Sequence, residues 1–96
     1  MTDAELRGLL RDCLTLWDVD ARVAATDDGM TIDAPDGRYI LQRAAPEMRP
    51  VRWLVQTPAR AAAGRPARAA PSIVAALSAL RNALGVGGAA ALRIGA

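Results

Sequence analysis

Residues 19–43 read VDARVAATDDGMTIDAPDGRYILQR, and apolar side chains alternate with polar ones along most of this stretch. Alternation with a period of two is the pattern of β-strands that bury one face. Two Asp-Gly pairs, at residues 28–29 and 36–37, interrupt the alternation. Such pairs are typical of hairpin turns, and Gly37 suits a positive φ. The stretch therefore predicts three consecutive antiparallel strands, the last of which is RYILQR.

A fourth strand is predicted at residues 51–57, VRWLVQT, in which Trp53 has the same parity as the two flanking valines. The residues expected to face the core are Val19, Val23, Ile32, Val51, Trp53 and Val55. The opposite face is expected to carry Asp20, Arg22, Thr31, Asp33, Arg52, Leu54 and Gln56, with either Ile40 or the pair Tyr39 and Leu41. Such a face can meet water, and its apolar members suit the centre of a homodimer interface.

Two helices are predicted to flank the strands. The first spans residues 3–16, with Thr2 and Glu5 in the positions of an N-terminal capping box. The second begins at residue 71 or 72 and ends before Gly85, which suits a left-handed C-cap. Their apolar stripes are Leu6, Leu9, Leu10, Cys13, Leu14 and Trp17 in the first helix, and Ile73, Val74, Leu77, Leu80 and Leu84 in the second.

These elements predict an α+β fold of two layers, an antiparallel four-stranded meander with the N-terminal and C-terminal helices packed on one face. Residues 1–86 are expected to form one domain, and residues 87–96 either a flexible tail or an edge strand within residues 90–95. Residues 58–71, PARAAAGRPARAAP, are predicted to be a surface connection, because three prolines and a glycine prevent a long helix.

Charge is distributed unevenly along the chain. All twelve basic residues are arginines; residues 1–47 carry ten acids and five arginines, whereas residues 48–96 carry seven arginines and no acid. The two halves either neutralise each other within the fold, which is the interpretation we favour, or present a surface of two signs to a partner.

The residues that usually carry catalysis are scarce. The chain has no histidine, the commonest general base and metal ligand near neutral pH. Cys13, the single cysteine, is predicted to be a buried core residue, and one unpaired thiol fits a reducing cytosol. Four aspartates between residues 27 and 36 do not follow the spacing of a calcium loop. We therefore expect no enzyme activity, no metal and no cofactor.

The leading hypothesis is a non-enzymatic protein-interaction or accessory module that forms a homodimer. The alternative is anion or nucleic-acid binding, although residues 58–71 offer only about three phosphate contacts and no interleaved aromatic rings. The residues expected to contact an anion or a partner are Arg49, Arg52, Arg60, Arg65, Arg68 and Arg81.

The order helix, antiparallel strands, helix resembles the layout of the small dimeric chaperones of bacterial secretion systems, which bind unfolded segments of effector proteins. The resemblance implies a protein partner. This chain differs from those acidic chaperones in its formal net charge of +2 and its arginine-rich connection. A cytoplasmic location without membrane contact is expected, because no apolar run reaches the roughly 18 residues of a membrane span. The first residues, MTDAELRGLL, mix acids and arginines into an apolar stripe, unlike a signal peptide.

Overall fold

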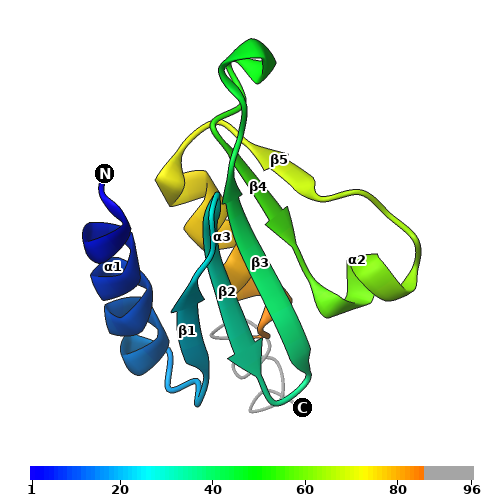
Figure 1. The fold of residues 1–96 in the computed structure, drawn as a ribbon. Coiled ribbons are helices and arrows are strands. Elements are labelled where there is room, and N and C mark those ends of the chain that lie inside the picture. Colours follow the sequence, from blue (N-terminus) through cyan, green and yellow to red (C-terminus); the bar gives the residue numbers. More distant parts are fainter. Residues whose placement is uncertain (86–96) are drawn as a thin grey trace.

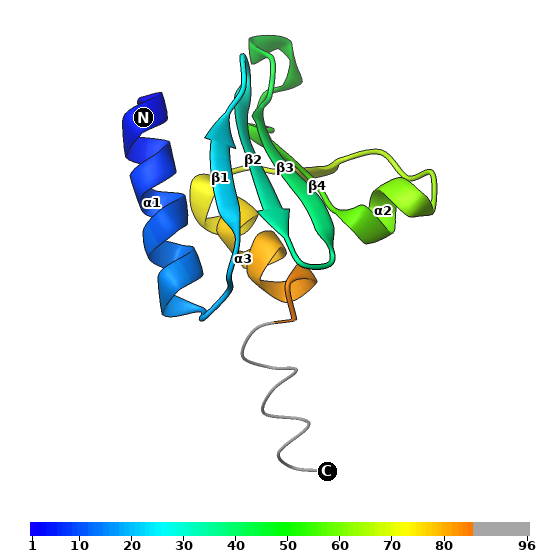
Figure 2. The same cartoon turned by 60° about the horizontal axis from the view of Figure 1, so that its bottom comes forward.

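The computed structural model describes residues 1–85 and shows an antiparallel sheet with helices against one side (Figures 1 and 2). Along the chain the elements are α1 (Asp3–Leu16), β1 (Arg22–Ala25), β2 (Gly29–Ala34), β3 (Gly37–Arg43), the 3-10 helix η1 (Pro46–Met48), β4 (Trp53–Gln56), α2 (Pro58–Ala62), β5 (Arg68–Ala70) and α3 (Ile73–Ala83). The five strands follow one another in space as they do in sequence. The predicted α+β class is confirmed.

Helix α1 has the predicted bounds and the predicted cap. The backbone N–H of Glu5 donates to the Thr2 hydroxyl over 3.2 Å, and the Thr2 N–H donates to the Glu5 carboxylate over 3.1 Å. These two bonds satisfy backbone donors that the first turn of a helix leaves open. Beyond the last turn, Asp18 adopts a φ of 57° and turns the chain toward β1.

The β2–β3 hairpin decides which side chains face the helices. Ile32 lies opposite Tyr39 and Met30 opposite Leu41, so Tyr39 and Leu41 point inward and Ile40 points to the open face. This register resolves the alternative that the sequence leaves open for β3. Gly37 has a φ of 138°, as predicted for the second hairpin turn.

The sheet has five strands rather than the predicted four, because residues 58–71 contain more structure than a surface connection. Thr57 caps the short helix α2 through its hydroxyl, and Pro58 fits the first turn, where its missing N–H costs nothing. The chain then returns as β5, which pairs antiparallel with β4 and buries Ala70. Alanine is a poor strand former, so tertiary pairing rather than local preference specifies this strand.

Helix α3 begins at the predicted place, and most of its predicted stripe packs against the core. Leu80 is fully buried, and Ile73, Leu77 and Leu84 are half-buried. Ser72 caps it, and Gly85 follows it with a φ of 73°, as predicted. The buried residues are Ala76, Ala79 and Leu80, whereas Val74 of the predicted stripe is 69 % exposed. Small alanine side chains let the helix lie close to β4 and β5, which the leucine spacing alone does not reveal.

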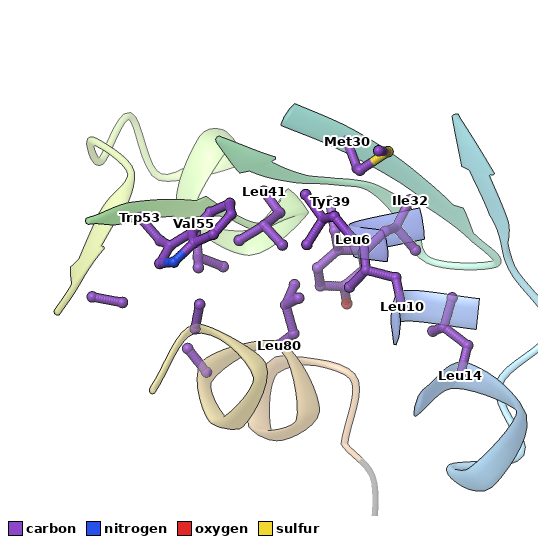
Figure 3. Close-up of a cluster of buried hydrophobic side chains, with 13 residues drawn as sticks. Leu6, Leu10, Leu14, Met30, Ile32, Tyr39, Leu41, Trp53, Val55 and Leu80 are labelled. Carbon is purple, nitrogen blue, oxygen red and sulfur yellow. The ribbon is translucent and has the colours of Figure 1, made fainter. Parts of the chain in front are cut away.

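The core lies between one face of the sheet and the two long helices (Figure 3). Its members are Leu6, Leu10, Leu14, Met30, Ile32, Tyr39, Leu41, Trp53, Val55, Ala70, Ala76, Ala79 and Leu80. Val19 and Val23 pack against it half-buried, as does Trp17 at the end of α1. Val51 is also half-buried, but it lies outside this cluster.

The other face of the sheet carries Thr31, Asp33, Ile40, Leu54 and Gln56, in agreement with the predicted parity. The edge strand predicted within residues 90–95 lies outside the described residues. None of the helices within residues 1–85 combines the length and the apolar character that crossing a bilayer requires.

Two glycines give a matched test of the fold. A Cβ at Gly29 would lie 2.0 Å from the carbonyl oxygen of Leu41, whereas a Cβ at Gly8 on α1 would meet nothing within 4 Å. We expect Gly29→Ala to lower the free energy of unfolding by about 2 kcal/mol or more, because β2 and β3 must separate. Gly8→Ala should raise it by about 0.5–1 kcal/mol. Urea unfolding of both variants checks this, and equal effects would contradict the β2–β3 register.

Candidate functional site

A groove of about 660 Å³ lies where the connection after β3, the start of β4 and the beginning of α3 meet. It is lined by Met1, Arg43, Ala44, Ala45, Pro46, Arg49, Val51, Arg52, Trp53, Pro71, Ser72 and Ile73. Three of these residues are arginines and none is acidic. Most of the others are apolar, so the groove combines positive charge with hydrophobic surface.

Arg43, the last residue of β3, is held in place by three contacts. One guanidinium nitrogen lies 2.9 Å from the carboxylate of Asp3, and another donates to the carbonyl oxygen of Met1 over 3.3 Å. The guanidinium carbon lies 5.7 Å from the centre of the Trp53 ring, within the range of a cation–π interaction. Arg43 therefore has a defined position at the edge of the groove.

Arg49 and Arg52 lie on the turn between η1 and β4 and are exposed. Neither forms an ion pair with a residue in the described part of the chain. Beside them, Trp53 is only 8 % exposed and serves as part of the core rather than as a free stacking surface. The two free guanidinium groups are thus the parts of this groove best placed to meet a negatively charged ligand.

One of the exposed apolar side chains lines the same groove. Met1 is 59 % exposed there. Met48 and Val74 are also exposed, but neither lines the groove.

The structure divides the six arginines predicted from the sequence. Arg49 and Arg52 line the groove, while Arg60 and Arg68 line a smaller hollow of about 310 Å³ beside α3. The remaining two, Arg65 and Arg81, are exposed but line neither cavity. Sequence reasoning missed Arg43, although its parity along β3 matches the inward-facing Tyr39 and Leu41.

The predicted neutralisation between the two halves of the chain does not occur through ion pairs within residues 1–85. The ion pairs there join Asp3 to Arg43 and Asp33 to Arg38, and all four residues belong to the acidic half. The arginines from residue 49 to 81 form no ion pair within residues 1–85, so their guanidinium groups remain available to solvent or to a partner. The structure therefore favours the second interpretation, in which the protein presents a surface of both positive and negative charge to a partner.

Cys13 is half-buried, whereas the sequence predicted a buried core residue. The residues Leu6, Leu10 and Leu14 occupy the centre of the buried stripe, and Cys13 lies on its flank. Burial, together with the nearby charge of Asp12, raises the pKa of the thiol and so disfavours the reactive thiolate.

Three of the four aspartates between residues 27 and 36 have separate partners. Asp28 accepts from Gln42 over 3.5 Å, Asp33 pairs with Arg38, and Asp36 accepts from the Tyr39 hydroxyl. No group of three or more acidic, cysteine or histidine side chains with metal-binding geometry occurs in the described part of the chain.

Tyr39 is the most strongly perturbed ionisable group. Its ring is buried, and its hydroxyl donates to Asp36 and also lies 3.3 Å from the carbonyl oxygen of Ala83. Burial first, and then the hydrogen bond and charge of Asp36, raise the pKa of Tyr39 far above its ordinary value. The hydrogen bond of the Tyr39 hydroxyl to Ala83 links β3 to the end of α3. Because the raised pKa keeps the phenol protonated, Tyr39 is a poor general base.

No family model matches the sequence, and neither the search of curated proteins nor that of solved structures finds a match.

Alkaline unfolding tests the environment of Tyr39. As pH rises through about 10, the unfolded tyrosine loses its proton while the folded one keeps it, so stability should fall. The chain has no lysine, and Cys13 can be replaced by alanine to remove its titration. In the Cys13→Ala background, the urea midpoint of unfolding should fall between pH 8 and pH 10.5, and it should fall less when Tyr39 is also replaced by phenylalanine. Equal declines would show that Tyr39 ionises as easily in the folded protein as in the unfolded chain.

Proposed function

We propose that this protein is a non-enzymatic interaction module that binds an acidic, partly apolar segment of a partner protein in the Arg43–Arg49–Arg52 groove. The observation that supports this proposal is the composition of the groove, in which three arginines and a majority of apolar residues line one cavity without an acidic side chain. We call this cavity the arginine groove.

Each part of the arginine groove suits a different part of such a segment. The planar guanidinium groups of Arg49 and Arg52 offer paired donors that match carboxylate geometry. Val51, Pro71 and Ile73 offer apolar surface to the side chains between the carboxylates. Hydrophobic contact combined with opposite charge is the combination that gives both affinity and orientation in protein recognition.

Nucleic-acid binding receives less support. Single strands are held by exposed aromatic rings together with a basic track. Trp53, the aromatic ring that lines the groove, is 8 % exposed and does not present a free face to a base. The arginines are also divided between two cavities, which leaves few phosphate contacts in either one.

A chaperone-like role, as the layout of the secretion chaperones implies, is one form of the proposed activity, because those proteins also bind segments of a partner chain. The fold likeness by itself says little about function, so the composition of the arginine groove supports the proposal more directly. A cytosolic location remains the prediction from the single cysteine.

A binding measurement tests the groove. The probe is a short fluorescein-labelled peptide of glutamates and leucines, the Glu/Leu probe, and its affinity is measured by fluorescence anisotropy. Replacing Arg49 and Arg52 by glutamine should weaken binding about tenfold or more, because two charge-assisted contacts are lost. The matched control replaces Arg65 and Arg81, which removes the same charge away from the groove and should change affinity less than about twofold.

The alternatives give different results in the same assay. Equal losses for the two double variants would mean that net charge alone attracts the probe, and the proposed groove would be wrong. Tighter binding of a single-stranded DNA than of the Glu/Leu probe would favour the nucleic-acid hypothesis instead.

The homodimer stays a prediction, and its interface would be the open face of the sheet. Ile40 and Leu54 are the large apolar residues on that face, and both are partly exposed. We expect light scattering to report a dimer that Leu54→Glu converts to a monomer, because a carboxylate would be buried at the contact. Leu16→Glu, at an exposed position on α1, should leave the dimer intact. A wild-type monomer at high concentration would contradict the prediction.

A further inference from the structure

Arg43 differs from Arg49 and Arg52 in the arginine groove, because it already forms an ion pair with a carboxylate of the same chain. Asp3 does not itself line the groove, yet it reaches the guanidinium of Arg43 over 2.9 Å. Arg49 and Arg52 form no ion pair within residues 1–85. One of the three cationic positions is therefore filled from within the molecule by the functional group that the proposed ligand would bring.

The structure of α1 does not depend on this ion pair. The helix start is fixed by the reciprocal bonds between Thr2 and Glu5, which do not use the Asp3 side chain. The helix is also fastened to the core by Leu6, Leu10 and Leu14. The carboxylate of Asp3 can consequently leave Arg43 without unfolding α1.

The exposure of the pair makes it easy to exchange. The side chains of Arg43 and Asp3 are 35 % and 56 % exposed, and ion pairs at such exposed positions contribute little to stability. The neighbouring Met1 both lines the groove and accepts a hydrogen bond from Arg43. Loss of the Asp3 contact would thus leave the guanidinium of Arg43, a lining residue of the groove, available to another carboxylate.

We propose that Asp3 is an intramolecular competitor for the arginine groove, and that a carboxylate of the bound partner segment replaces it on Arg43. The inference rests on the proposed function and adds to it a built-in limit on affinity. It also assigns a role to Arg43, as a contact that becomes available when Asp3 withdraws.

The test compares Asp3→Asn with Asp12→Asn, using the Glu/Leu probe. Asp12 lies on the same helix, is exposed and forms no ion pair with a described residue, so its replacement matches the change in charge. We expect Asp3→Asn to bind the probe about two- to fivefold more tightly than Asp12→Asn, which corresponds to removal of an exposed ion pair. With Arg43 replaced by glutamine, the Asp3 substitution should change affinity no more than the Asp12 substitution does, because there is nothing left to compete for.

Failure of this inference can be told apart from failure of the proposed function. If the probe binds and Arg49/Arg52 replacement weakens it, but Asp3→Asn binds no more tightly than Asp12→Asn, the competition is wrong and the groove stands. Weaker binding by Asp3→Asn would show that Asp3 instead holds Arg43 in its binding position. If the probe binds equally well without Arg49 and Arg52, or does not bind at all, both proposals are overturned.

Discussion

The register between β2 and β3 is the constraint on which both the core and the arginine groove depend. It places Tyr39 and Leu41 opposite Ile32 and Met30, so that these four apolar side chains share the face that meets the helices. A slip of one residue would turn every side chain of β3 to the other face. Gly29 fixes this register sterically, since no side chain fits between it and the backbone of Leu41.

The same register positions the arginine groove. Arg43 has the parity of Leu41 and lies opposite Trp53 on β4, so its guanidinium reaches the ring and the start of α1 rather than the open face. Arg49 and Arg52 then enter the groove because the turn through η1 returns the chain to β4 beside β3. The site is therefore a consequence of where the strands begin and end.

Charge is separated along the sequence of this small domain. The arginines from residue 49 to residue 81 lie between η1 and the end of α3, whereas all ten acids precede Arg49 in the chain. Direct neutralisation within residues 1–85 is limited to two ion pairs, both in the acidic half. Arginines that are left without an ion pair attract a partner of opposite charge.

Local rules determined most elements of the fold, since the capping box set the start of α1, the Asp-Gly turns set the hairpins, and Gly85 ended α3. The parity of β4 likewise gave Trp53 its place in the core. Each of these features depends on residues close together in sequence, where turn geometry and side-chain periodicity act directly. Tertiary structure alone decided β5, the alanine face of α3 and the grouping of Arg43 with Arg49 and Arg52. These features arise from pairing and packing between distant segments. Alanine favours a helix locally and therefore does not indicate strand β5, and the grouping of the arginines depends on segments that are far apart in the sequence.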